Sequence, residues 1–221
     1  MTLERQIVVP GMLAEYRSFR QLVEGLSAGE WATPTRCAGW AVSDVAGHVI
    51  GQLTDVVNFR LDGLGTPEAT ARQAKERAGR PPKELAEELE AGIPTAEALA
   101  AGFDDEAWAA PVAGSATPSL GFGLESLWFD TYLHADDIRA ALGRPTQAGE
   151  GIVPSLSHIA QVLTDQGWGP ATLDFAGMPA FTVSGGGGRR IDGDPMTFVL
   201  VSTGRGDPAT LGLDPSVNIY R

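Results

Sequence analysis

The stretch C-A-G-W-A-V-S-D-V-A-G-H-V-I-G-Q at residues 37–52 decides the fold together with W-F-D-T-Y-L-H-A-D-D-I-R-A-A-L-G-R-P at residues 128–145. Each segment has helical periodicity and carries one of the three histidines of the chain, His48 in the first and His134 in the second. Asp130 precedes His134 by four residues, which places both side chains on one helical face. If His48 faces them across a helical bundle, the three form the ligand set of a catalytic zinc or similar divalent ion with an open position for substrate.

The composition limits the classes of protein that the chain can belong to. Its 221 residues suit one large domain or two small ones, and 43% hydrophobic with 20% charged residues is typical of a globular protein with a proper core. The net charge of −12 argues against nucleic acid and membrane surfaces as partners. Without a signal-peptide pattern or a run of about 18 apolar residues, and with one cysteine, we expect a cytoplasmic protein.

Four long segments have helical spacing, and we predict helices at about 11–25, 42–61, 82–101 and 120–142. The second is expected to build an apolar stripe from Val45, Val49, Leu53, Val56 and Phe59, with His48, Gln52 and Asp55 on a neighbouring stripe. Ser27 and Glu30 have the form of a capping box for a short helix, and Pro94 is expected to kink or split the third long one. Four helices with an inward polar cluster predict a bundle with a site in its core.

The pattern changes after about residue 146. We predict a helix at 154–166, strands at 171–175 and 180–184, and a last helix at 195–203. The glycines at 185–188 predict a hairpin turn, because they lack the context and the lysine of a phosphate-binding loop. The chain is therefore expected to be α+β and mostly helical, with a four-helix bundle at residues 1–146 and a small α+β domain at residues 147–221.

Three strings in this sequence, in order, resemble the mycothiol-dependent maleylpyruvate isomerase family. Residues 37–48 resemble its Cys-Pro-Gly-Trp-Thr-Val-x-Asp-Val-x-x-His signature. D-T-Y-L-H-A-D-D-I-R-A-A-L-G-R-P at 130–145 resembles Glu-x-x-x-His-x-x-Asp-(apolar)-x-x-Ala-x-Gly-Arg-Pro, and the segment from residue 192 to 205 is similar to a Gly-Asp-…-Gly-Arg helix. The resemblance implies a DinB-like bundle followed by a small sterol-carrier-like domain.

The resemblance also implies roles for single residues. His48 and His134 match the metal-binding histidines, and Asp130 stands where the family usually has the longer glutamate. Arg205 aligns with the family's C-terminal arginine, which implies a catalytic and cofactor-binding role in holding a carboxylate near the metal. The implied cofactors are a divalent metal, with zinc expected, and mycothiol as co-substrate. Asp137 matches a family position and is expected to orient an imidazole.

The implied chemistry is activation of a small thiol as a metal-bound thiolate, which then attacks a small electrophile. The product would be either a transferred thioether or, after reversible addition, a cis–trans isomer. Maleylpyruvate has two carboxylates and the matched positions offer only Arg205 as a cation, which favours a transferase. Two alternatives remain: a non-enzymatic binder of small molecules, and a structural bundle whose metal is sealed by a fourth ligand such as His158 or Asp137. The chain is expected to be a monomer or a homodimer.

The sequence allows two roles for three further aspartates and suggests one for the cysteine. Asp44, Asp55 and Asp136 could orient imidazoles, but they are as readily explained as solvated charges on helix surfaces. Cys37 is expected to be a buried structural thiol, because no second cysteine or histidine lies near it in the sequence.

Overall fold

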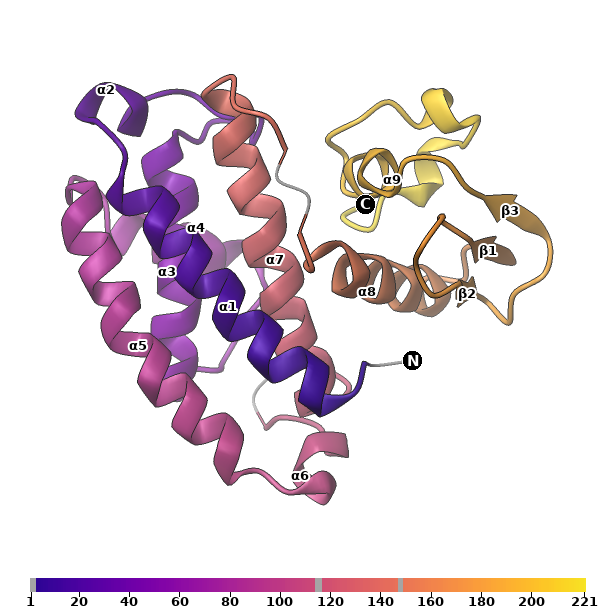
Figure 1. Ribbon diagram of the computed structural model, residues 1–221, viewed down its shortest axis with the longest axis horizontal. Helices are drawn as coiled ribbons and strands as arrows, with labels where there is room; N and C mark the ends of the chain where they lie inside the picture. Colours follow the sequence, from indigo (N-terminus) through magenta and orange to yellow (C-terminus); the bar gives the residue numbers. More distant parts are fainter. Residues whose placement is uncertain (1–2, 114–116, 147–148) are drawn as a thin grey trace. The chain divides into compact units, whose positions relative to one another are not determined.

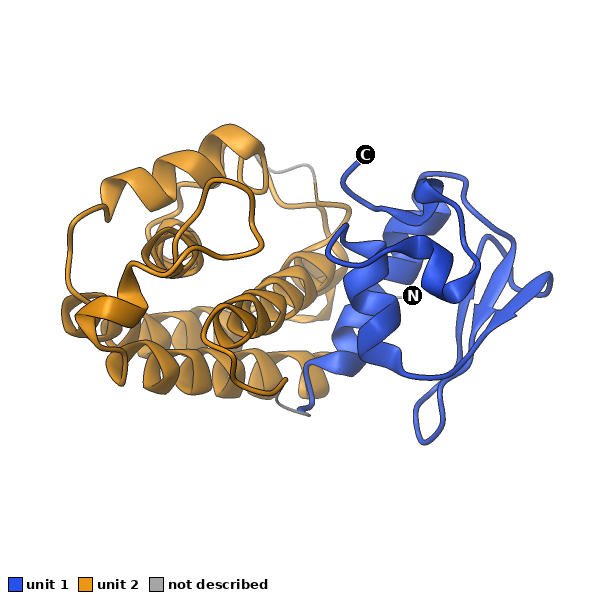
Figure 2. Cartoon of the chain, turned by 90° about the horizontal axis from the view of Figure 1, so that it is seen from above, with its two compact units in different colours: residues 1–3, 149–221 blue, residues 4–148 orange. Residues whose placement is uncertain are grey.

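The computed structural model describes residues 3–113, 117–146 and 149–221. They form two compact units, one within residues 4–148 and the other within residues 149–221 together with Leu3 (Figure 2). The first unit is built from helices, and the second combines helices with a three-stranded sheet. The prediction of a mostly helical α+β fold is therefore confirmed. The domain boundary predicted near residue 147 lies outside the described residues.

The larger unit is a four-helix bundle (Figure 1). Its long helices are α1 (Arg5–Glu24), α3 (Val42–Val57), α5 (Pro82–Gly102) and α7 (Leu120–Ala141). α1 packs on α5 and α7, and α3 packs on the same two helices from the other side. The faces that meet carry large apolar side chains that exclude water, among them Tyr16, Phe19, Ile50, Leu85 and Leu133. Burial of these faces is the main source of stability for such a bundle.

Two of the long helices contain a proline in their interior. α1 begins at Arg5, earlier than predicted, and runs through Pro10. α5 is one uninterrupted helix in spite of Pro94, so the predicted split is wrong. Each proline deprives the carbonyl four residues earlier of its partner, but both prolines lie on exposed faces, where water can bind that carbonyl.

α3 ends at Val57, four residues before the predicted end, because the chain turns there. Phe59 has a left-handed φ of 57°, and Arg60 N–H donates to the Asp55 carbonyl across the turn. This is a Schellman ending with phenylalanine where glycine is usual, a conformation that is strained for a side chain of this size. Phe59 is 67% exposed, so its predicted place in the apolar stripe is wrong.

Three short helices complete the larger unit: α2 (Ala28–Trp31), α4 (Pro67–Glu76) and α6 (Asp105–Ala109). α2 starts with the predicted capping box, in which Ser27 and Glu30 satisfy each other's backbone N–H groups. α4 and α6 were not predicted. The start of α4 has a clear signal in the sequence, since Thr66 accepts a hydrogen bond from Ala69 N–H and Pro67 occupies the first helical position.

In the smaller unit a sheet and a second helix both pack on one helix. α8 (Ile152–Asp165) contacts β2 and α9 (Pro195–Ser202), and two short 3-10 helices, η1 (Pro208–Leu211) and η2 (Pro215–Val217), follow. Inside this unit the rings of Phe175 and Phe198 lie 5.8 Å apart. The predicted helices at 154–166 and 195–203 and both predicted strands are present, each within a few residues.

The sheet has the order β2-β1-β3, with β1 (Ala171–Leu173) between β2 (Phe181–Val183) and β3 (Arg189–Ile191). β2 pairs with β1 antiparallel and β3 pairs with it parallel. The glycines at 185–188 therefore cross the amino end of β1 and join opposite edges, so the predicted hairpin is wrong. All four have positive φ, and a Cβ on Gly188 would lie 2.3 Å from the Pro170 carbonyl oxygen. In neither unit is a described helix long and apolar enough to cross a membrane.

Candidate metal centre

The structure brings His48, Asp130 and His134 together in the core of the bundle. His48 on α3 faces α7, and its Nε2 lies 3.1 Å from Asp130 Oδ2. His134, one turn after Asp130 on α7, has its Nε2 3.5 Å from the other carboxylate oxygen, Oδ1. The two imidazole rings meet edge to face with their centroids 5.2 Å apart. Both histidines are buried and the Asp130 side chain is 17% exposed, so this group reaches solvent on one side.

The tautomer of His48 is fixed by α4. His48 Nδ1 lies 2.8 Å from Gln73 Oε1, and Gln73 Nε2 donates to Asp55 Oδ2 at 2.7 Å. Because a carboxylate only accepts, the amide of Gln73 has to present its oxygen to His48. The hydrogen of His48 is therefore on Nδ1, and the lone pair of Nε2 points at Asp130. Asp55 is fully buried and is neutralised by Arg72 and Arg60, with N–O distances of 2.6 and 2.5 Å.

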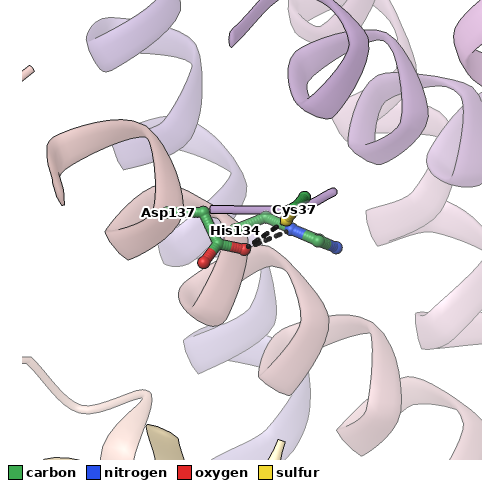
Figure 3. A group of neighbouring side chains, drawn as sticks. All are labelled: Cys37, His134 and Asp137. Atoms are coloured by element: carbon green, nitrogen blue, oxygen red, sulfur yellow. Dashed lines mark hydrogen bonds and ion pairs between the residues drawn. The ribbon is translucent and has the colours of Figure 1, made fainter. Parts of the chain in front are cut away.

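The tautomer of His134 is fixed by Asp137, on the next turn of the same helix (Figure 3). His134 Nδ1 donates to Asp137 Oδ2 at 2.8 Å, and the Cys37 thiol donates to the same oxygen at 3.2 Å. Arg36 Nε pairs with the other oxygen of Asp137 at 2.5 Å, and Arg36 Nη2 pairs with Asp136 at the same distance. Asp137 thus orients His134 so that its Nε2 lone pair also points at Asp130.

When both imidazoles are neutral, their Nε2 lone pairs and the Asp130 carboxylate converge, and this arrangement attracts a cation, either a proton or a metal ion. Metal–ligand bonds of about 2.0–2.1 Å at the tetrahedral angle place ligand atoms about 3.4 Å apart. The imidazole–carboxylate distances of 3.1 and 3.5 Å lie on either side of that value. The shorter side chain of Asp130, compared with glutamate, still reaches both histidines. The donor set of His48, Asp130 and His134 therefore fits a zinc-like divalent ion.

A second group of potential ligands, Cys37, His134 and Asp137, lies on the opposite edge of the His134 ring. Its carboxylate already holds the Arg36 guanidinium and the N–H of His134. A metal ion there would have to displace both of these hydrogen-bond donors. In the first group both imidazole Nε2 atoms face the Asp130 carboxylate, so it is the better candidate for a metal site, and the second group supports it through His134.

The electrostatics of the core agree with this assignment. Burial disfavours the charged imidazolium of His48, but the Asp130 carboxylate and the Gln73 oxygen outweigh it, so the pKa of His48 is raised. A raised pKa shows that the pocket between these groups attracts positive charge. Tyr16 of α1 lies nearby, and burial, reinforced by the charge of Asp130, raises its pKa. Tyr16 is therefore a neutral phenol in this core and no candidate for an anionic ligand.

Small residues allow α4 to approach α3 closely enough for this arrangement. A Cβ on Gly51 would lie 2.6 Å from the Gln73 Cβ, and one on Gly47 would lie 3.3 Å from the Ala74 Cα. On the other side of His48 the Trp40 ring packs at a centroid distance of 5.8 Å. Packing therefore explains part of the motif at residues 37–52: Trp40 packs on the His48 ring, and Gly51 leaves room for Gln73, which binds His48.

Several sequence predictions about these neighbours need correction. Asp55 and Asp136 are buried ion-pair partners of arginine and not solvated charges. Cys37 is half-buried, and the reason given for a purely structural thiol was wrong, because folding places His134 next to it. Asp44 accepts a hydrogen bond from Ala41 N–H at the start of α3 and so caps that helix.

Gln73 and Arg36 were not predicted from the sequence, although both contact the groups that orient the histidines. Arg205 and His158 belong to the smaller unit. Arg205 follows α9 and is half-buried, with its Nη1 donating to the Thr203 carbonyl at 3.1 Å. Its role toward a carboxylate remains a prediction.

Comparison with known proteins gives two kinds of finding. A family model described as the mycothiol maleylpyruvate isomerase N-terminal domain matches residues 12–139. The crystal structure of the mycothiol-dependent maleylpyruvate isomerase superposes with a TM-score of 0.67 at 17% identity, covering 96% of each chain. The crystal structure of a histidine-to-alanine mutant of that enzyme superposes with a TM-score of 0.65 at 16% identity, and the match covers 96% of each chain. A search of curated protein sequences found no match.

Proposed function

Because the chain belongs to the mycothiol maleylpyruvate isomerase family, we propose that it is a metal-dependent enzyme with mycothiol as its co-substrate. His48, Asp130 and His134 are proposed to hold a divalent metal, with zinc as the expected ion. The reaction proposed is attack of the mycothiol sulfur on an electrophilic carbon of a small molecule. Displacement of a leaving group, or addition to an activated double bond, gives a thioether, and reversible addition gives a cis–trans isomer. The observation that carries this proposal is the convergence of two oriented imidazole lone pairs on one carboxylate.

When bound, the metal would supply Lewis acidity that keeps the thiol of the co-substrate deprotonated at neutral pH. The residues around the ligands keep the two imidazoles in the orientation and tautomer that metal binding needs. Gln73 and Asp137 hold the protons of the two imidazoles on Nδ1, away from the metal, and so prevent a loss of ligands by rotation or by the wrong tautomer. Among the described residues, no fourth His, Cys, Asp or Glu joins this ligand group, which leaves coordination positions for a thiol.

The structural alternative, a sealed metal, is not favoured by this arrangement. It requires a fourth protein ligand, and the first carboxylate beyond the group, Asp137, faces the far edge of the His134 ring. Arg205 is proposed to hold a polar or anionic group of the substrate or of mycothiol. The division into a metal-binding bundle at residues 1–146 and a smaller domain at residues 147–221 is part of the same proposal.

The test is metal content and conjugation activity of the purified protein. We expect about one metal ion per chain by elemental analysis, and its loss in His48→Ala and His134→Ala. His158→Ala removes the third histidine, which lies outside the group, and is expected to keep the metal. Conjugation of mycothiol to monochlorobimane should stop on chelation and return when zinc is added. A protein that takes up no metal after reconstitution would contradict the proposal.

A further inference from the structure

The bundle contains an apolar cavity of about 400 Å³, a size typical of small-molecule sites. Its walls come from α3, α5 and α7 and from the segment that follows α3. The side chains that form most of its surface are aliphatic or aromatic, among them Leu53, Val56, Leu99, Phe103 and Leu124. An apolar cavity of this size gains most from a ligand that itself buries apolar surface.

Charge is absent from the described lining of this cavity. No Asp, Glu, Lys, Arg or His contributes to it in the part of the chain that the structure describes, and the polar side chains are those of Gln52, Thr117 and Ser126. The Ser126 hydroxyl donates to the Phe122 carbonyl at 2.8 Å. A carboxylate placed here would lose its water without gaining a cation, which is strongly unfavourable. The cavity therefore discriminates against anions.

Gln52 is the exceptional polar group in the wall. Its residue is 8% exposed, and its buried Oε1 has no hydrogen-bond partner. Buried polar atoms without a partner are rare in native proteins and cost stability. Whichever way the amide is turned, it offers an unused hydrogen bond to a molecule in the cavity.

The position of Gln52 connects the cavity to the candidate metal centre. Gln52 follows His48 by one turn on α3, and Leu127 of the cavity wall precedes Asp130 by almost one turn on α7. At 1.5 Å per residue, these wall positions lie about 5–6 Å along the helices from the ligand positions. The end of the cavity marked by Gln52 is thus the end nearest to the metal ligands.

Phe59 lines the cavity away from the metal ligands, beyond the end of α3. It lines the cavity with its ring 67% exposed, and it holds the strained left-handed backbone that ends α3. The turn keeps the Phe59 ring at the border between cavity and solvent. Its backbone is strained and its apolar ring is exposed to water, and both features destabilise the free protein. A ligand that covers the ring would remove the unfavourable exposure.

We propose that this cavity binds the electrophilic co-substrate and selects an uncharged molecule with an apolar chain and one polar group. Gln52 is assigned the hydrogen bond to that polar group, which places the reactive end of the molecule toward His48 and Asp130. The inference rests on the proposed function for the chemistry at that end. The substrate class inferred is a neutral electrophile with an apolar chain, and not a dicarboxylate.

The first arm of the test is a chain-length series. Conjugation of mycothiol to 2-butenal, 2-hexenal and 2-octenal is expected to rise in kcat/KM by about tenfold for each added pair of methylenes, since each buried methylene contributes about 0.8 kcal/mol. An octenal analogue that ends in a carboxylate is expected to react at least about 100-fold more slowly than 2-octenal. Equal rates across the series, or preference for the carboxylate, would overturn the inference.

The second arm measures binding without thiol, so that no reaction takes place. Displacement of the neutral dye N-phenyl-1-naphthylamine should need far less 1-octanol than octanoate. Gln52→Leu is expected to weaken octanol binding about tenfold, to leave dye binding unchanged and to raise the Tm, because an unpartnered buried amide is removed. Gln21→Leu, on the exposed face of α1, should leave octanol binding unchanged.

The two arms test the ligand preference of the cavity and the proposed reaction separately. Selective octanol binding without any conjugation would support the cavity and contradict the proposed function. Conjugation without the expected selectivity would support the function and overturn the substrate class. Gln52→Leu with unchanged octanol affinity, or with a lowered Tm, would overturn the role given to this residue.

Discussion

Asp137 and Asp136 form a matched pair that tests how the metal centre is supported. Both are buried, and both pair with the Arg36 guanidinium at 2.5 Å, but only Asp137 accepts the Nδ1 hydrogen of His134. In Asp137→Asn a single amide oxygen must serve Arg36 on one side and His134 on the other. Whichever way the amide is turned, its NH2 group faces a donor, so His134 loses its anchor or Arg36 loses its partner.

The two variants should therefore differ in metal affinity, and Asp137→Asn should also be the less stable of the two without metal, because its NH2 group faces a donor. Each removes a charge-assisted hydrogen bond from Arg36, whose side chain is 25% exposed, and each is expected to lose about 1–3 kcal/mol of unfolding free energy. Loss of a partner that orients a ligand typically weakens metal binding 10- to 100-fold, about 1.4–2.7 kcal/mol, and this is expected for Asp137→Asn alone.

Competition with a chromophoric chelator gives the zinc dissociation constant, and urea unfolding of the metal-free variants gives their stability. Equal loss of zinc affinity in Asp136→Asn and Asp137→Asn would show that the charge near Arg36 matters and the orientation of His134 does not. Unchanged affinity in Asp137→Asn would refute the supporting role of this residue altogether.

Two further predictions concern α4 and α2. Gly51→Ala places a Cβ 2.6 Å from Gln73, so zinc affinity should fall about tenfold in the same chelator competition, whereas Gly47→Ala, with 3.3 Å to its nearest neighbours, should nearly retain it. Hydrogen bonds from Ser27, together with Arg144, lower the pKa of Glu30 from 4.5 to about 2. A carboxylate with a lowered pKa stabilises the fold above pH 4.5 and loses this effect as the pH falls toward 2. The urea midpoint of Glu30→Gln should therefore lie below that of the wild type at pH 6 and meet it near pH 2; a constant gap would contradict this.

The helices that carry the candidate ligands, and the shared face of Asp130 and His134, could be predicted because their signals are local. The spacing of Asp130 and His134 puts both on one face of any helix, whatever it packs against. The capping box at Ser27 and the glycine after α7 are likewise short patterns with one structural meaning. For the same reason the helical nature of both histidine segments followed from their apolar periodicity alone.

The features that could not be predicted depend on contacts between distant segments. Gln73 lies 25 residues from His48, and nothing in its own neighbourhood distinguishes it from a surface glutamine. Arg36 and Asp137 are 101 residues apart. The end of α3 was predicted too late because Phe59 continues the apolar periodicity, while the backbone there adopts a turn usually reserved for glycine. The third strand was missed because residues 189–191 begin with two exposed arginines, so the alternation of buried and more exposed residues seen in the other two strands is absent.

The distribution of charge around the two histidines suggests why they are supported in different ways. Asp137 supports His134 directly and Asp55 supports His48 through Gln73, and each of these carboxylates is paired with arginine. The charges of the supporting groups are thereby offset, and Asp130 contributes the one carboxylate charge of the inner group. Two neutral imidazoles, one carboxylate and a divalent cation would leave a single positive charge, which a thiolate neutralises. A second unpaired carboxylate would cancel that charge and remove the attraction for the thiolate, so the arginines are as necessary to the proposed chemistry as the ligands themselves.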